Sequence, residues 1–222
     1  MSKWHAQAPS GATHVVINTE WGNLNVASLP RLAADAVVDQ RSPNPGQQTF
    51  EKLIAGMYLG RIATLTLLHM DREATLFTDD QRQRLQSEPG ALSTPLLSRV
   101  ENDTSEGLST TRQELASALN SPLTDTALAA VKEVCHLVTR RAARLSAAAI
   151  VGVLEHCGAG GEALQSPTVA VDGGLFEHHA AFAAMLAEAV AEMGVKATLR
   201  LTPDGSGVGA ALLAAAAESR ST

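Results

Sequence analysis

Residues 204–209 read DGSGVG and combine three glycines with a serine hydroxyl. Glycine lets the backbone approach a ligand closely, because no Cβ stands in the way. Residues 196–201 before this segment alternate polar and apolar side chains, and residues 210–218 after it are rich in Ala and Leu. The pattern predicts a strand, a glycine loop and a helix, with Ser206 as the helix cap and exposed N–H groups that attract phosphate. The alternative is an ordinary helix start with turn glycines.

A carboxylate follows the first apolar run of the chain. Residues 14–18 read HVVIN and predict a short buried strand, and Glu20 comes just past its end. Ligands of α/β sheets gather at the carboxyl ends of strands, so Glu20 is a candidate ligand-binding residue. The alternative is a turn carboxylate that only solvates its loop.

A second pair of polar side chains lies at the start of a predicted helix. Asn44 fits an N-cap and Pro45 the first helical position, and apolar spacing carries the helix over residues 45–68. Gln48 and Glu51 are three residues apart and therefore share a face, where an amide and a carboxylate can bind a polyol. The alternative role of Glu51 is compensation of the helix dipole, worth about 0.3–1 kcal/mol.

A strand and a glycine loop recur before the DGSGVG segment. Residues 167–171 predict a strand that leads into the loop 172–174, and a helix is predicted over residues 178–193. Gly194 ends that helix, and the next strand begins at Val195. A strand–helix–strand–helix unit predicts parallel strands with a right-handed crossover. Both Asp-Gly loops then project from one edge of the sheet, which favours a nucleotide site.

The longest helical pattern covers residues 125–155 and is apolar on all sides over residues 145–154, as in a helix buried between layers. Arg140, Arg141 and Arg144 form a stripe in its middle. A salt-bridged solvent face is a commoner explanation of such a stripe than a phosphate site.

The totals of the 222-residue chain exclude several classes of function. Apolar residues make up 45% and aromatic residues 3%, which predicts a sizeable aliphatic core, and the net charge of −6 argues against nucleic acid as a partner. Cys135 and Cys157 fall on one predicted helix, about 33 Å apart, too far for a disulfide. The histidines lack zinc spacing, and neither a membrane-spanning run nor a signal peptide is visible. We therefore expect a cytoplasmic protein without a metal site of its own.

In combination, these stretches resemble the hexokinase family, and specifically its plant-type branch. They occur in the order that the family shows and cover nearly the whole chain. The matching stretches are KWH (3–5), INTEWGN (17–23), NPGQ (44–47), FEK (50–52), GMYLG (56–60), RAARLSAA (141–148), VDGGLFEH (171–178) and DGSGVGAA (204–211).

The resemblance implies an α/β fold of the actin-like ATPase (ribonuclease H-like) type, with a parallel or mixed sheet flanked by helices. Residues 1–13 would form an arm and residues 14–219 an incomplete large domain. The activity implied is ATP-dependent phosphorylation of the 6-hydroxyl of glucose or a similar hexose, with ATP and Mg²⁺ as substrate and no obligate protein partner.

The resemblance also assigns roles to single residues. Glu20, Gln48 and Glu51 match the sugar contacts of the large domain. The positions that match nucleotide contacts are Gly205 and Ser206 in the phosphate loop, Gly173 in the adenosine motif, and Thr94, Ser98 and Gly56 close to the nucleotide.

The chain departs from the family in one large respect. Nothing in it matches the family's N-terminal half, which carries the small domain, the aspartate that acts as general base and two glycine-threonine phosphate loops. Because phosphoryl transfer depends on positioning and preorganised charge, we expect the chain alone to be inactive. A non-catalytic module that binds sugar or nucleotide, for example as a sugar sensor, is the alternative function.

Overall fold

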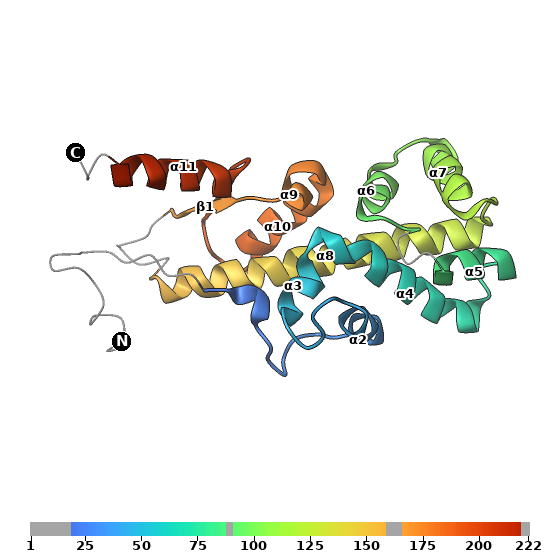
Figure 1. Cartoon of the computed structure of the whole chain (residues 1–222). Helices are drawn as coiled ribbons and strands as arrows, with labels where there is room; N and C mark the ends of the chain where they lie inside the picture. Colours follow the sequence, from blue (N-terminus) through green and yellow to red (C-terminus); the bar gives the residue numbers. More distant parts are fainter. Residues whose placement is uncertain (1–18, 88–90, 159–165, 219–222) are drawn as a thin grey trace.

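One long helix, α8 (Asp125–His156), runs through the centre of the computed structural model, which describes residues 19–87, 91–158 and 166–218 (Figure 1). The Thr124 side chain caps this helix by accepting a hydrogen bond from Ala127 N at 3.2 Å. The 32 residues of α8 span about 48 Å, and the helix predicted over residues 125–155 is confirmed. None of the helices in the described ranges has the length and apolar character needed to cross a membrane.

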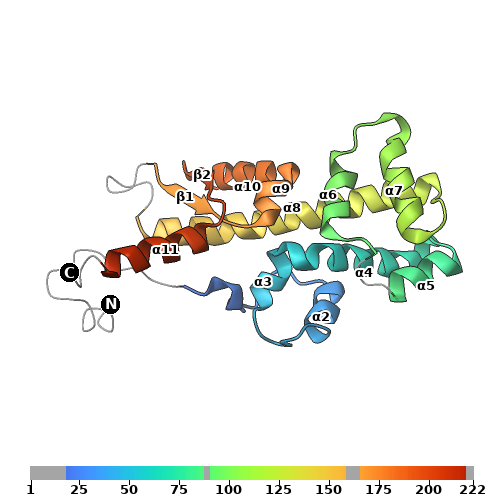
Figure 2. The same ribbon diagram turned by 45° about the horizontal axis from the view of Figure 1, so that its top comes forward.

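The other elements surround α8. Helices α3, α4, α6 and α10 contact it directly, α11 lies at the same end of the molecule as β1, and α5 and α7 lie at the opposite end (Figures 1 and 2). In chain order these elements are η1 (Trp21–Asn23), α2 (Ala33–Gln40), α3 (Thr49–Ile54), α4 (Gly56–Ala74), α5 (Asp79–Ser87), α6 (Thr94–Asn102), η2 (Glu106–Leu108), α7 (Ser109–Leu119), β1 (Thr168–Val171), α9 (Gly174–His178), α10 (Ala180–Glu192), β2 (Thr198–Leu201) and α11 (Gly205–Glu218).

The strands β1 and β2 form a parallel pair in which Val171 lies opposite Leu201. The chain passes from β1 through α9 and α10 to β2 and then into α11, which confirms the predicted strand–helix–strand–helix unit. The strand predicted over residues 14–18 lies outside the described residues. Side chains along both strands alternate between exposed and partly buried, and α11 has no buried residue. This end of the molecule is therefore the least covered.

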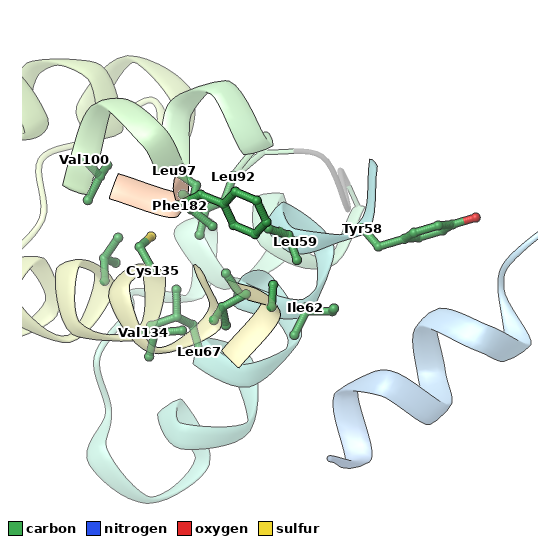
Figure 3. Close-up of a cluster of buried hydrophobic side chains, with 14 of the residues drawn as sticks. Tyr58, Leu59, Ile62, Leu67, Leu92, Leu97, Val100, Val134, Cys135 and Phe182 are labelled. Carbon is green, nitrogen blue, oxygen red and sulfur yellow. The ribbon is translucent and has the colours of Figure 1, made fainter. Parts of the chain in front are cut away.

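The core lies between α4, α6 and α8 and is mainly aliphatic, as the composition predicts (Figure 3). Leu59, Ile62 and Leu67 of α4 are fully buried, and they meet Leu97 of α6 and Val134 of α8. Burying one such side chain stabilises the fold by about 1.5–3 kcal/mol. Packing of these three helices is therefore the main source of stability.

The helix predicted over residues 45–68 is divided in two, which corrects the sequence analysis. Its parts, α3 and α4, meet at Ala55, whose ψ of 140° is extended. Gln48 occupies the N-cap position of α3. Asn44, the predicted cap, lies before α3, and its side-chain oxygen accepts a hydrogen bond from the Ser42 hydroxyl at 3.4 Å. Its carbonyl accepts from Lys52 Nζ at 2.7 Å.

The helix predicted over residues 178–193 is observed as α10, which begins just after His179, where φ is −120° and ψ is 86°. The His179 side chain is only 2% exposed, and its Nε2 lies 2.9 Å from Oε2 of Glu101, which is 3% exposed. Thr139 of α8 donates a hydrogen bond to the same carboxylate oxygen. This buried pair ties α6, α8 and the start of α10 together, and it holds the residue that separates α9 from α10.

Two arginines of the α8 stripe form salt bridges to neighbouring helices. Arg141 donates to both carboxylate oxygens of Asp35 in α2, at 2.8 and 2.7 Å. Arg144 pairs with Glu192 of α10 at 2.6 Å. Arg140 is exposed and makes no ion pair or hydrogen bond within the described residues. The stripe is thus explained by salt bridges and solvent rather than by phosphate.

A buried carboxylate closes the connection between α6 and α7. One oxygen of Asp103 accepts hydrogen bonds from the backbone N–H and the hydroxyl of Ser105, and the other accepts from both groups of Thr111, at 2.8 and 2.6 Å. The Ser105 hydroxyl, followed by that of Thr111, holds the pKa of the Asp103 carboxyl well below its usual range.

Asp103→Asn should destabilise the protein at neutral pH. Both oxygens of Asp103 accept hydrogen bonds, one from Ser105 and the other from Thr111. An amide has only one oxygen, so its NH₂ group would face the donors of one of these two residues. A carboxyl whose pKa is lowered on folding contributes stability above its unfolded pKa of about 3.9 and loses it as the pH falls below that value. Urea unfolding of both proteins at pH 7 and pH 3 checks this. The free-energy difference should shrink at pH 3, and a difference independent of pH would contradict the assignment.

Candidate functional site

Hydrogen bonds join the turn at η1 to the start of α3, 25 residues further along the chain. Glu20 and Gln48 both adopt the left-handed region, with φ of 47° and 49°, at the starts of η1 and α3. The Gln48 N–H donates to Asn23 Oδ1 at 3.0 Å, and the Thr49 hydroxyl donates to the Leu24 carbonyl at 3.0 Å. Non-glycine residues in this region cost free energy, so the hydrogen bonds between the segments hold a strained arrangement.

Gly22 allows the side chains of α3 to lie over the backbone of η1. A Cβ at residue 22 would come within 2.6 Å of Gln48 Oε1 and 3.3 Å of Glu51 Cβ. The ring of Trp21 packs against that of Phe50, with centroids 6.2 Å apart and planes inclined by 59°. The amide of Gln48 and the start of the Glu51 side chain are therefore fixed beside the turn that begins at residue 20.

A buried lysine fixes the loop that precedes α3. The Lys52 side chain is 3% exposed and donates to Asp39 Oδ1 and to the Asn44 carbonyl, both at 2.7 Å. Asp39 also accepts from the N–H of Gly46 at 3.0 Å. The hydrogen bond from Lys52 lowers the pKa of the Asp39 carboxyl. These contacts fix the loop that places Gln48 at the start of α3.

The two Asp-Gly loops meet at the carboxyl ends of β1 and β2. The Thr202 N–H donates to the Val171 carbonyl at 3.0 Å, which extends the ladder by one step beyond the strands. A Cβ at Gly205 would lie 3.4 Å from Asp172 Oδ2, so the second loop contacts the first. The parallel register thus brings both loops to one edge, as the sequence predicts.

Glycine is required in the first loop, and in the second it leaves room for the Asp204 side chain. Gly173 has φ of 142° and ψ of 141°, a conformation that is essentially restricted to glycine. A Cβ at Gly207 would lie 2.6 Å from both carboxylate oxygens of Asp204. Helix α11 begins at Gly205, so Ser206 lies in its first turn and is not the cap that the sequence predicts. Its backbone N–H remains at the helix N-terminus, where N–H groups lack helical partners.

A cavity of about 700 Å³ connects these parts. It is lined by the Glu20 turn, the start of α3, the α3–α4 junction, the β1–α9 loop and the apolar side chains Phe182 and Leu186 of α10. Glu20, Glu51 and Asp172 contribute carboxylates, and no described lysine, arginine or histidine lines the cavity. Such a site accepts hydrogen bonds from hydroxyl groups and disfavours a bare anion.

The remaining predicted residues lie on a second wall. Gly56 lines the cavity at the start of α4, and its carbonyl accepts a hydrogen bond from the Thr94 hydroxyl. Thr94 also accepts from the Gly60 N–H at 3.2 Å, and it lines a smaller neighbouring cavity of about 260 Å³. Ser98 lies one turn further along α6, is buried, and accepts from Asn102 Nδ2 at 3.4 Å.

The structure therefore brings most, but not all, of the predicted residues to the same cavity. Glu20, Gln48, Glu51, Gly56 and Gly173 line one cavity, Gly205 contacts it through Asp172, and Thr94 and Ser98 stand behind Gly56. Further lining residues that sequence reasoning did not single out are Trp21, Ser146 and Phe182. Ser146 had a visible signal, because it is the polar residue in the otherwise apolar stretch 145–154 of α8. The described residues contain no group of three or more potential metal-binding side chains.

Comparison with known proteins identifies the family of this chain. A family model described as Hexokinase matches residues 1–216. Hexokinase-7 of Oryza sativa subsp. japonica is 42% identical over 213 residues, and Hexokinase-1 of Arabidopsis thaliana is 39% identical over 222 residues. These matches cover 91% and 96% of this chain, but only 45% and 44% of those two proteins. The chain thus spans less than half of the length of its relatives.

Solved structures agree with the sequence matches. A hexokinase from Schistosoma mansoni, solved in complex with glucose, is 30% identical and superimposes with a TM-score of 0.71 over 83% of this chain and 42% of that chain. A crystal structure of another hexokinase gives a TM-score of 0.68 at 27% identity. The predicted α/β fold of the actin-like ATPase type, present as an incomplete domain, is therefore confirmed. On the matches of sequence and of structure, the chain belongs to the hexokinase family.

Proposed function

We propose that this chain is the sugar-binding and nucleotide-binding portion of a hexokinase that transfers phosphate from ATP to the 6-hydroxyl of glucose, the first step of glycolysis. The observation that carries the proposal is that Glu20, Gln48 and Glu51 line one acidic cavity together with the Gly173 loop. Hexokinase family membership supports sugar phosphorylation in general, and the choice of glucose and of these residues is the finer proposal.

The carboxylates of Glu20 and Glu51 accept hydrogen bonds from sugar hydroxyls, and the amide of Gln48 can both accept and donate. Analogues that lack these hydroxyls would lose the contacts and bind more weakly. The absence of a cation among the described lining residues suits a neutral polyol.

The nucleotide is proposed to bind across the two Asp-Gly loops as MgATP, with Mg²⁺ as part of the substrate. Gly173 and Gly205 let the backbone approach it, Ser206 offers an N–H and a hydroxyl at the start of α11, and Gly56 lies beside them. The hydrogen bond from Thr94 to the Gly56 carbonyl holds this wall in place. Ser98 is assigned to the nucleotide region only by the resemblance.

Catalysis requires more than these contacts. The cavity is open, and Glu20 and Glu51 are exposed, so water has access to any bound phosphate. The general base of the family matches no position in this chain. We therefore propose that the 222-residue chain binds sugar and nucleotide without significant turnover. A module that only binds or senses sugar is the second candidate, and it rests on the same cavity.

The cytosol is the proposed location of the protein. Cys135 and Cys157 are both free thiols, which suits a reducing compartment. Burial raises the pKa of the Cys135 thiol to about 12, so this residue stays protonated and behaves as a small apolar side chain.

Glucose should bind to the chain and change the fluorescence of Trp21, which lines the cavity. The titration is best made in a Trp4→Phe background, so that Trp21 is the only indole. Glu51→Gln should weaken glucose binding about 10- to 100-fold, because it removes one charged acceptor. Glu133→Gln, an exposed glutamate on α8 outside the cavity, is the matched control. Equal affinities of the two variants would rule out the proposed sugar site.

Gly173→Ala should lower the affinity for MgATP about 5- to 100-fold, because alanine cannot hold φ of 142° without about 1–3 kcal/mol of strain. Gly194→Ala is the matched control, since Gly194 also has a positive φ, of 81°, but lies outside the cavity. Calorimetric titration with MgATP distinguishes them, with melting curves to compare the loss of stability. Similar loss of affinity in both variants would point to a general effect on folding.

A coupled assay with glucose and MgATP should show turnover at least about 100-fold below the 1–100 s⁻¹ that is typical of kinases. The physical reason is that the chain alone offers an open cavity without the family's base. Turnover within the normal range would refute the inactivity of the isolated chain, while the binding proposals would stand.

A further inference from the structure

A second and larger cavity, of about 1130 Å³, lies between α2, α4 and α5. It shares no lining residue with the acidic cavity. Helices α2, α4 and α5 lie away from β1 and α11 in both views of the ribbon (Figures 1 and 2). The cavity therefore has no part in the proposed binding of sugar or nucleotide, and its own lining must indicate what it could bind.

One face of α4 provides a basic and apolar wall. Arg61, Leu65, Leu68 and Arg72 all line the cavity, at the spacing i, i+4, i+7 and i+11 that places residues on one side of a helix. Eleven residues correspond to about 16 Å along the helix axis. The wall thus carries a cation near each end and an aliphatic surface between them.

Helix α2 completes this wall with small aliphatic side chains and one more cation. Ala34, Val37 and Val38 face the same cavity, and Arg41 follows at the C-terminal end of the helix. Leu85 of α5 adds to the apolar surface, and the imidazole of His69 is the only ring among the described lining residues. The apolar surface is therefore suited to an aliphatic chain rather than to a stacked ring.

The three arginines lack acidic partners. Arg41, Arg61 and Arg72 make no ion pair or hydrogen bond within the described residues. Arg82, which also lines the cavity, is by contrast bonded to Asp71 Oδ2 at 2.6 Å, to Asp79 and to the Phe77 carbonyl. The chain carries 23 acidic and 17 basic residues, so unpaired cations gathered at one cavity do not follow from its composition.

We propose that this cavity binds an amphipathic anion, that is, an aliphatic chain with a carboxylate or phosphate head. The guanidinium group pairs with both kinds of head through parallel N–H donors, and the Ala, Val and Leu side chains remove the aliphatic chain from water. An inorganic anion would leave the apolar surface exposed, and a neutral lipid would leave the arginines unpaired. An amphipathic anion uses both properties of the cavity.

The test uses the 222-residue chain and four probes at concentrations below micelle formation: dodecanoate, dodecyl phosphate, dodecan-1-ol and inorganic phosphate. Calorimetry measures affinity, and spectra of methyl-labelled valine and leucine locate the site through Val37, Leu65 and Leu68. At least one of the two amphipathic anions should bind and shift these methyl signals. Dodecan-1-ol and inorganic phosphate should each bind at least about tenfold more weakly.

The double variant Arg61→Gln/Arg72→Gln should weaken binding of the anion at least about tenfold, and Arg41→Gln alone should weaken it several-fold. Arg140→Gln, at an exposed arginine on α8 outside the cavity, should leave the affinity unchanged. The proposal is overturned if dodecan-1-ol binds as tightly as dodecanoate, if the methyl signals of the cavity do not respond, or if the affinity survives loss of the arginines. If the double variant fails to fold, the affinity of Arg41→Gln and the methyl spectra of the unmodified chain still test the proposal.

Discussion

The packing of α8 against its neighbours is the constraint on which the rest of the structure depends. Its middle presents Ala142, Ala143 and Ala147, all fully buried, so that other helices can approach its axis closely. Helices α3 and α4 pack on this rod, and so does α10, whose Phe182 and Leu186 line the acidic cavity. Both walls of the candidate site therefore pack on the same helix, α8.

Buried ionic contacts specify how these helices are arranged. The bidentate pair of Arg141 with Asp35 joins α8 to α2, and the pair of His179 with Glu101 joins α10 to α6. Removing one member of a buried pair costs about 3–5 kcal/mol, because the other charge is left without a partner. The aliphatic core provides most of the stabilisation, while these pairs exclude alternative packings of similar helices.

Sequence reasoning recovered the elements whose signals are local. The long α8, the parallel β1 and β2, and the helix after the second glycine loop follow from periodicity and turn residues. Helices α2 and α7 are among those that the sequence did not predict, because α2 buries only three short or polar residues and α7 follows a polar stretch. The helix predicted over residues 45–68 shows the opposite effect, since it breaks at the extended Ala55 although its helical pattern is continuous.

The sequence predicted which residues form the candidate site better than it predicted their conformations and contacts. Spacing placed Gln48 and Glu51 on one face, and both line the same cavity. Nothing in the spacing indicates that Gln48 adopts a left-handed conformation, because that depends on the hydrogen bond to Asn23 from a distant part of the chain. Likewise, the contact of Gly205 with Asp172 follows only from the register of β1 and β2.

The bare surface of α11 has a consequence for how the protein behaves in solution. Val208, Leu212 and Leu213 are 53%, 66% and 75% exposed, and no residue of this helix is buried. Water next to such side chains is released whenever two apolar surfaces meet, at about 25 cal/mol for each Å² covered. Crowding the molecules together therefore favours clustering through this helix.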